Sequence, residues 1–238
     1  MKQIMDLHTH TSFCNHAYSS LKENMDYSHE IGLKVLGWSE HGYGMPGTTV
    51  RPMFFNFRVI QDYYKDVRIL KGMEANIFNY QGDIFEEEVL GKMDYVIASL
   101  HKNTIKPGTI EENTNAVMKA MDNPRVNILG HIDDGTFPLD YKTIVQKAAD
   151  KNIAIEVNNS SFIEKTFRKD SKKNIQEILN WAKTYKTKII MNSDAHIHYE
   201  IGNVHLSIEQ AAKNDFPEEL IINNSIDKLE KLLEMKVL

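Results

Sequence analysis

Residues 4–10 read IMDLHTH, a short apolar run that ends in two histidines separated by one residue. Successive side chains of a β-strand point to opposite faces, so a strand here directs His8 and His10 to one side and Thr9 to the other. The two imidazoles then converge on one point. His16 follows within the same stretch, DLHTHTSFCNH at residues 6–16. The spacing therefore predicts a paired imidazole site at the end of the first strand.

Six further runs of similar length and composition follow along the chain. Each is rich in Ile, Val and Leu and has the length of a strand. They lie at residues 34–41, 68–77, 93–101, 126–131, 153–161 and 188–196. Because the runs are almost continuously apolar, they are typical of parallel strands that are covered on both faces.

Most intervals between these runs have helical spacing. In residues 19–33, Ser20 and Glu23 form a capping box and Gly32 ends the helix. Further helices are predicted at 110–122, 140–151, 171–185 and 225–238, with another at 57–66, whereas 75–92 is predicted to be mostly loop. Strands and helices that alternate about every thirty residues are typical of parallel βαβ units. The sequence therefore predicts an α/β fold, a (β/α)7 barrel, with residues 1–238 as a single domain.

The composition limits the classes of function. With 28 basic and 33 acidic residues, the chain has a formal net charge of −5 and no basic block that would follow a phosphate backbone, so long nucleic acid is not an expected partner. The one cysteine, Cys14, excludes an internal disulfide and a Cys-rich zinc module. No apolar segment has the length of a membrane span, and no leader is evident. We expect a soluble cytoplasmic protein, and a homo-oligomer stays open.

Histidines and carboxylates stand at the ends of nearly all the predicted strands. The carboxyl ends of barrel strands meet at one rim, where α/β barrels carry their catalytic groups. Nine side chains share this rim: His8, His10, His16, His41, Glu74, His101, His131, Asp194 and His196. Seven imidazoles and two carboxylates crowded together without a cation would be hard to keep folded, so the set predicts a metal centre.

Residues two positions before the donors are expected to face the barrel interior as well. They are Asp6, Ser39, Gly72, Ser99, Leu129 and Asn192. Small and polar residues there suit hydrogen bonds to the ligating imidazoles. On the sixth run, Glu156 and Asn158 have the same parity and are interpreted as a polar layer rather than as ligands. The histidines off the pattern are interpreted as structural or surface residues: His29, His198 and His205.

The motifs DLHTH, SEHG, KGMEAN, SLH, GH and NSDAH, together with His16, occur in this order over residues 6–196. Because it has these motifs in this order, the chain resembles the PHP superfamily, which is named for polymerase and histidinol phosphatase. It looks most like the YcdX-like phosphatase branch of that superfamily. The resemblance implies a distorted, TIM-like (β/α)7 barrel with a trinuclear metal site. It implies that His8, His10, Glu74 and Asp194 surround one metal, that His101 and His131 share Glu74 at a second, and that His16, His41 and His196 hold a third.

Nine donors among three divalent cations leave coordination positions open for water and substrate. Imidazole and carboxylate donors without thiolate suit zinc, which is our first choice, and also manganese or iron. A phosphate monoester can span several cations while a metal-activated hydroxide attacks phosphorus. We therefore expect a metal-dependent phosphatase that acts on small phosphorylated substrates. Asp194 is the candidate to orient or deprotonate the attacking water, and Glu74 is the candidate bridge.

Other residues near the predicted rim have two interpretations each. Arg51, Lys102 and Arg168 are candidates for binding the substrate phosphate, or they are solvated surface charges. Cys14 is interpreted as a bystander, because hydroxide already supplies the nucleophile. The segment 42–57, with three glycines and two prolines, is predicted to overlie the pocket as a loop, or to be a hydrophobic flap that serves barrel closure or subunit contact.

Three other functions stay open. An amidohydrolase-type enzyme acting on an amide or lactone also begins with H-x-H and ends with a strand aspartate. That family usually bridges its metals with a modified lysine at the end of its fourth strand, where this chain has His101. Histidinol phosphatase shares the same cluster and differs in its loops. A non-catalytic metal-binding module would lack some of the donors, and none of the nine is missing.

Overall fold

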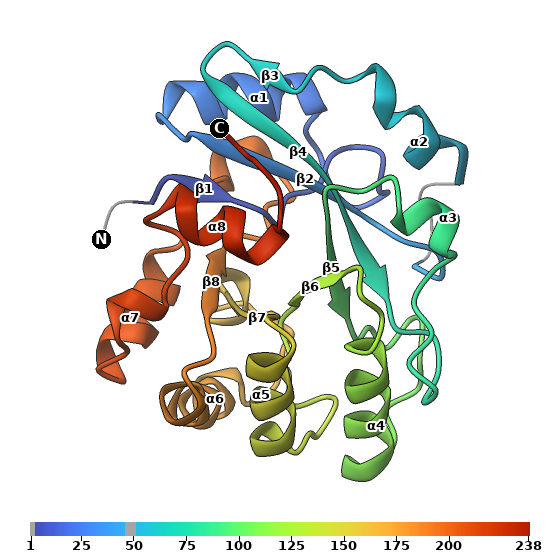
Figure 1. Cartoon of the computed structure of the whole chain (residues 1–238), viewed down its shortest axis with the longest axis vertical. Coiled ribbons are helices and arrows are strands. Elements are labelled where there is room, and N and C mark those ends of the chain that lie inside the picture. Colours follow the sequence, from blue (N-terminus) through green and yellow to red (C-terminus); the bar gives the residue numbers. More distant parts are fainter. Residues whose placement is uncertain (1–2, 46–50) are drawn as a thin grey trace.

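The computed structural model describes residues 3–45 and 51–238 (Figure 1). Parallel strands form a sheet in the order β1-β2-β4-β5-β6-β7-β8, and the short β3 pairs antiparallel with β4. The strands are β1 (Met5–Asp6), β2 (Val35–His41), β3 (Tyr63–Tyr64), β4 (Val67–Asn76), β5 (Tyr95–Ser99), β6 (Val126–Leu129), β7 (Ala154–Asn158) and β8 (Ile189–Asn192). The seven parallel strands coincide with the seven predicted runs.

The barrel is nearly closed between its first and last strands, just beyond their carboxyl ends. The backbone N–H of His10 donates to the carbonyl of Ala195 at 2.9 Å, and the N–H of Ala195 donates to the carbonyl of His8 at 3.3 Å. Closure therefore runs through the two segments that carry His8, His10, Asp194 and His196. The predicted distorted (β/α)7 barrel is confirmed.

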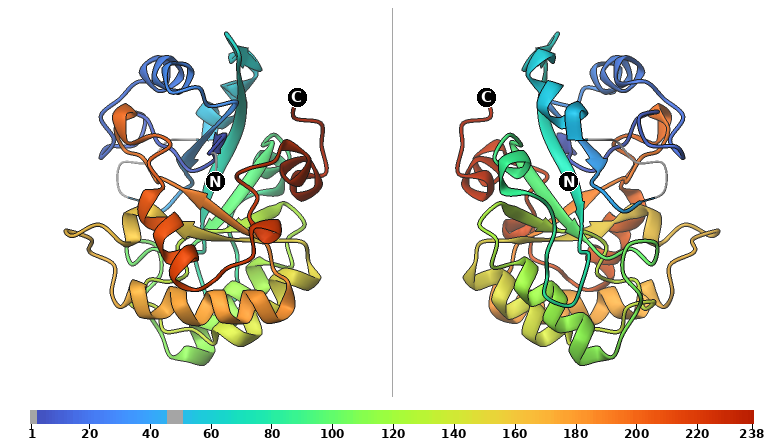
Figure 2. Two further views of the ribbon diagram at one scale, coloured as in Figure 1. Left: turned by 90° about the vertical axis from the view of Figure 1, so that its left-hand side faces the viewer. Right: turned by 90° about the vertical axis from the view of Figure 1, so that its right-hand side faces the viewer.

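Most of the helices cover the outside of the sheet (Figure 2), and the last one packs against the cluster inside the barrel. The helices are α1 (Leu21–Glu30), α2 (Arg51–Asn56), α3 (Glu87–Leu90), α4 (Ile110–Ala120), α5 (Tyr141–Asp150), α6 (Ser171–Tyr185), α7 (His205–Lys213) and α8 (Ile226–Leu233). The capping box of Ser20 and Glu23 forms as predicted. Gly32 follows α1 with φ of 77°, a left-handed conformation that favours glycine. Helices α4, α5 and α6 lie side by side, and the sequence patterns do not predict α7.

Two segments after β2 differ from their predictions. The predicted helix at 57–66 is only a 3₁₀ turn at Phe57–Val59, because the following residues form β3 and pair with Val67 and Arg68 of β4. The segment 42–57 is not all loop, since residues 51–56 form α2. Phe54 and Phe57 are buried, and the Phe57 ring stacks on Trp38 with 4.1 Å between the ring centroids. Phe54 and Phe57 therefore pack in the hydrophobic core, which agrees with the interpretation of this segment as a hydrophobic flap. Residues 46–50 of the segment lie outside the described residues.

The end of the barrel opposite the donors is filled with apolar side chains. Tyr95 lies inside the barrel, and its hydroxyl donates to the carbonyl of Leu7 at 2.6 Å. A Cβ added at Gly72 would lie 2.2 Å from Cζ of Tyr95, so glycine is needed there to make room for the ring. Leu229 and Leu232 of α8 pack against this interior cluster. The far end is therefore a packed core, which leaves the donor end as the open one.

The predicted inward parity fails on β6. Ile128 packs inside the barrel with Leu70 and Tyr95, whereas Leu129 packs in the cluster on the helix side. His131 has φ of 30°, so the alternation does not continue from Leu129 to His131. The left-handed residue turns the imidazole inward although the strand register would point it outward.

Within residues 3–45 and 51–238, no helix combines the length and the apolar composition that crossing a membrane requires.

Candidate metal centre

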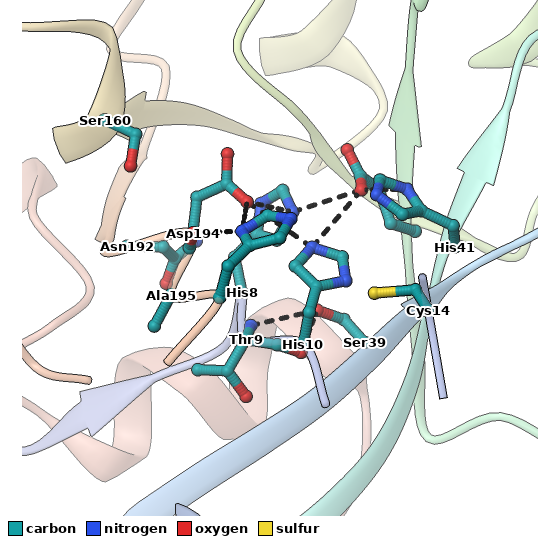
Figure 3. A network of polar contacts seen from close by, with 12 residues as sticks. His8, Thr9, His10, Cys14, Ser39, His41, Ser160, Asn192, Asp194 and Ala195 are labelled. Atoms are coloured by element: carbon teal, nitrogen blue, oxygen red, sulfur yellow. Dashed lines mark hydrogen bonds and ion pairs between the residues drawn. The ribbon is translucent and has the colours of Figure 1, made fainter. Parts of the chain in front are cut away.

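All nine predicted donors gather at the carboxyl ends of the barrel strands. His8 and His10 follow β1, His41 ends β2, Glu74 lies in β4, and the others follow β5, β6 and β8 or the loop before α1. Figure 3 shows His8, His10, His41 and Asp194 directed toward one another. Only His16 is exposed to solvent; the rest are buried or half-buried. The predicted meeting of these side chains at one rim is thus a property of the structure.

Glu74 stands between two groups of imidazoles. Its Oε2 lies 2.6 Å from His41 Nδ1 and 3.3 Å from His8 Nε2. Its Oε1 lies 2.9 Å from His131 Nε2 and 3.3 Å from His101 Nε2. One carboxylate oxygen of Glu74 therefore faces each group of imidazoles.

Asp194 completes the group around the first strand. Its Oδ1 lies 3.5 Å from His8 Nε2 and 3.4 Å from His10 Nε2. Asp194 has φ of 57°, a conformation that aspartate tolerates better than most residues, and this turns its side chain into the barrel mouth. His8, His10 and Asp194 together place three donor atoms within 4.8 Å of one another.

A second cluster of imidazoles lies toward the solvent side. The Nε2 atoms of His41 and His16 are 3.3 Å apart, and the ring centroids of His16 and His196 are 4.7 Å apart. Donor atoms of His10, His41 and His196 lie within 4.8 Å of one another, as do those of His41, Glu74 and His101. These groups share His10, His41 and His196, and His131 joins them through its 2.9 Å contact with Glu74.

The donor atoms fit divalent cations. The Nε2 atoms of His8 and His10 are buried and have no hydrogen-bond partner among the described residues, and both lie within 3.5 Å of Glu74 Oε2. Buried polar atoms without partners destabilise a fold unless something else satisfies them. These atoms converge on one point, and imidazole with carboxylate is a donor set that zinc, manganese and iron accept.

The electrostatics separate the imidazoles into two kinds. Burial lowers the pKa of His8, but the carboxylates of Glu156, Asp194 and Glu74 outweigh burial and raise that pKa well above its usual value. Burial lowers the pKa of His41 to about 3 and that of His196 to about 4. His41 and His196 are therefore neutral near pH 7 and ready to bind a metal, whereas His8 has to lose a proton first.

Carboxylates and amides from inside the barrel orient the imidazoles. His8 Nδ1 lies 2.7 Å from Glu156 Oε1, and His101 Nδ1 lies 2.7 Å from Asn76 Oδ1. His10 Nδ1 faces Glu40 Oε2 at 3.9 Å. The sequence predicts that Glu156 faces inward but not that it contacts His8. The contacts of Asn76 with His101 and of Glu40 with His10 are not predicted from the sequence.

The residues predicted to hold the imidazoles have other partners. Asp6 accepts from the backbone N–H groups of Ser193 and Gly202 and from the Ser193 hydroxyl, so this part of the prediction is wrong. Asn192 affects the imidazoles only indirectly: its side-chain amide donates to Glu156 Oε1 at 2.9 Å, and this carboxylate contacts His8. The prediction failed for Asp6 because β1 is regular only over Met5–Asp6, and the strict alternation ends there.

The three predicted phosphate-binding cations have different surroundings. Arg168 is buried, and its Nη2 donates to Asp194 Oδ2 at 2.7 Å while its Nη1 donates to Asn158 Oδ1 at 2.9 Å. Lys102 lines the cavity beside His101. Arg51 begins α2 and pairs with Glu88, so the structure does not bring its guanidinium to the donors.

Cys14, interpreted from the sequence as a bystander, lies next to the predicted metal donors. Its Sγ lies within 4.8 Å of donor atoms of His10 and Glu40, and the same distance also holds for His16 and His196. The thiol donates to the carbonyl of Thr11 at 3.4 Å, and burial raises the pKa of Cys14. A protonated, hydrogen-bonded thiol is not an activated nucleophile.

The histidines outside the pattern have structural partners. His29 pairs with Asp66, His198 Nδ1 lies 2.9 Å from the Ser19 hydroxyl, and His205 Nδ1 lies 2.6 Å from Asn203 Oδ1. None of these rings belongs to the groups of potential metal donors among the described residues.

Comparison with known proteins gives the family. The PHP domain model matches residues 6–188. A probable phosphatase from Clostridium novyi is 44% identical over 237 residues, with 99% of this chain and 96% of the relative covered. A probable phosphatase from Acetivibrio thermocellus is 37% identical, with 99% and 97% covered.

The fold is shared with solved structures as well. Histidinol phosphate phosphatase from Lactococcus lactis, solved with zinc, L-histidinol and phosphate, superposes with a TM-score of 0.59 at 17% identity and covers 89% of this chain and 92% of its own. At that identity the likeness shows the barrel architecture alone. The family model and the near full-length relatives together confirm the predicted resemblance: this chain belongs to the PHP domain family.

Proposed function

We propose that the protein is a metal-dependent phosphatase that hydrolyses small phosphate monoesters at a trinuclear centre, with the whole chain acting as one domain. The position of Glu74 carries the proposal, because its two oxygens face two separate groups of imidazoles. The reaction class is supported by relatives that are named probable phosphatases and that match this chain over almost their full length.

The proposed ligand groups are those that the resemblance to the PHP superfamily implies, and the contacts of Glu74 with His8, His101 and His131 support the first two. His8, His10 and Asp194 would hold one cation with Glu74, and His101 and His131 would hold a second. His16, His41 and His196 would hold a third. Divalent ions bound there would supply charge stabilisation for the phosphoryl oxygens and an activated water.

Asp194 has two functions in this proposal. Its Oδ1 faces the imidazoles of His8 and His10, while its Oδ2 is held by Arg168 and Asn158. Burial raises the pKa of Asp194, but His8, His10 and Arg168 outweigh burial and hold it well below its usual value. In this proposal Asp194 binds metal and orients or deprotonates the attacking water, while Arg168 and Asn158 hold its carboxylate in place.

Arg168 is the cation best placed for the substrate phosphate. It is buried beside Asp194, and it lines both cavities at the mouth of the barrel. A guanidinium presents several donors in a fixed fork, which suits the oxygens of a phosphate. Lys102 is exposed at the wall of the larger cavity and would contribute a more flexible positive charge.

The test is an activity panel on purified protein loaded with zinc, manganese or iron. We expect turnover of an aryl phosphate that is lost on chelation and in His10→Ala, with no turnover of amides or lactones. The matched control is His205→Ala, because His205 is an exposed histidine bonded to Asn203 and lies off the donor set. Turnover of an amide or lactone without phosphatase activity would replace the proposal with the amidohydrolase-type alternative.

A further inference from the structure

Two adjoining cavities open at the mouth of the barrel. The smaller, of about 220 Å³, is lined by donors such as His41, Glu74 and Asp194. The larger, of about 670 Å³, is lined by the donors His16, His101 and His131 and, beyond them, by residues such as Leu100 and Phe137. Both are bordered by a common set, which includes His16, His101, Phe167 and Arg168. The site therefore has two compartments that share one boundary.

The two compartments suit different parts of a substrate. The smaller is lined by six of the nine donors, including both carboxylates, so under the proposed function it holds the phosphate. The larger has the size of a small-molecule pocket, which runs from roughly 300 to 1,000 Å³, and exceeds what a phosphate needs. Buried Leu100 and Phe137 give it apolar walls. Among the described residues that line it, Asp134 is the only carboxylate, and its Oδ1 accepts from the backbone N–H groups of Thr136 and Lys169.

Phe167 stands at the boundary between the compartments. Its side chain is 76% exposed, so water contacts most of the ring. The Arg168 guanidinium lies 5.6 Å from the ring centroid, so the ring is placed beside the group that reaches the metal donors. A second ring in the larger cavity could stack on Phe167 and cover apolar surface that water now contacts.

We propose that the larger cavity takes an aromatic leaving group and that Phe167 selects this group by stacking on it. The inference rests on the proposed function, since it assigns the substrate class of the same site. Phe167 is then a specificity-determining residue, and it is not required for the reaction itself. The substrate class is a phosphate monoester with an aromatic ring a short distance from the ester oxygen.

The experiment compares three primary alkyl monoesters whose leaving oxygens are chemically alike: 2-phenylethyl, 2-cyclohexylethyl and ethyl phosphate. The metal-loaded wild type should have the highest kcat/KM for 2-phenylethyl phosphate. In Phe167→Ala, kcat/KM for this substrate should fall about 10-fold, the size of an aromatic pair, while ethyl phosphate should be unaffected. Phe167→Leu should keep turnover of the cyclohexyl substrate but not the preference for phenyl over cyclohexyl.

The control is Tyr18→Ala, because Tyr18 is an aromatic residue 78% exposed that lines neither cavity. It should change none of the three values. Equal losses for all substrates in Phe167→Ala, or an unchanged preference, would overturn the inference while leaving the phosphatase intact. Equal kcat/KM for the phenyl and cyclohexyl substrates in the wild type would overturn its aromatic part. Turnover of none of the monoesters would instead count against the proposed function.

Discussion

Glu156 accepts a hydrogen bond from Nδ1 of His8 at 2.7 Å, and both side chains are fully buried. The same carboxylate accepts from the backbone N–H of His131 and from the side-chain amides of Asn192 and Asn158. One residue at the bottom of the centre therefore fixes the tautomer of His8 and the position of His131. Nε2 of His8 is left facing Glu74 and Asp194.

Replacing this carboxylate should weaken metal binding without unfolding the barrel. Glu156→Gln keeps the shape of the side chain and removes the charge that makes His8 a stronger ligand. We expect zinc affinity to fall by about 10- to 100-fold, the usual effect of losing a group that orients a ligand. Competition with a chromophoric chelator measures it. Glu88→Gln is the control, since Glu88 is exposed and pairs with Arg51; equal affinities in all three proteins would contradict the assigned role.

Turnover should depend on the planar guanidinium of Arg168, with its several N–H donors, and not only on its positive charge. Arg168 contacts Asp194 and Asn158 through two different nitrogens, which a lysine cannot reproduce. Arg168→Lys is therefore expected to lower kcat/KM for phosphate monoesters by about 10- to 100-fold. Arg51→Lys, at the pair with Glu88, should stay within about 2-fold because surface pairs contribute little. Steady-state kinetics decides, and a fully active Arg168→Lys enzyme would refute the requirement.

Zinc loading should release protons at pH 7. The carboxylates around His8 hold its pKa well above the usual value, so the metal-free imidazole is protonated there, while a ligating imidazole is neutral. His41 and His196, with pKa values of about 3 and about 4, are already neutral and release none. We expect release of about one or two protons per chain and zinc affinity that falls as pH falls. Calorimetry in buffers of different ionisation enthalpy measures this, and binding without proton release would be inconsistent with it.

Gly72 should be intolerant of a side chain. An added Cβ would lie 2.2 Å from Cζ of the buried Tyr95, so the ring or β4 would have to shift. We expect Gly72→Ala to lower the free energy of unfolding by about 1–3 kcal/mol, as overpacking usually does. Gly32→Ala is the comparison, because nothing lies within 4 Å of its added Cβ and only its φ of 77° is strained. Urea unfolding of both variants separates crowding from backbone strain, and a Gly72→Ala protein as stable as the wild type would exclude crowding.

The sequence was sufficient to predict the barrel and the meeting of the nine donors. This worked because parallel strands end at one rim, so a donor at each strand end reaches the same place whatever the loops do. His8, Glu74 and Asp194 are examples: they are far apart in the chain and in contact in the structure.

Contacts that depend on local backbone detail could not be predicted in this way. Ile128 rather than Leu129 faces the interior, and the left-handed conformation of His131 then turns its imidazole inward, which no periodicity encodes. The predicted helix at 57–66 became the edge strand β3 because pairing with β4 outweighed local propensity. The contacts of Asn76 and Glu40 with imidazoles depend on side-chain reach across neighbouring strands, which one sequence does not define.

The most direct test of the metal centre is a count of metal per chain. Protein stripped with a chelator, reloaded with zinc and freed of excess by gel filtration should hold three zinc ions per chain by elemental analysis. Glu74→Gln should hold fewer, because both proposed groups around it lose a donor. A wild-type protein that retains no zinc, manganese or iron after the same treatment would contradict the account.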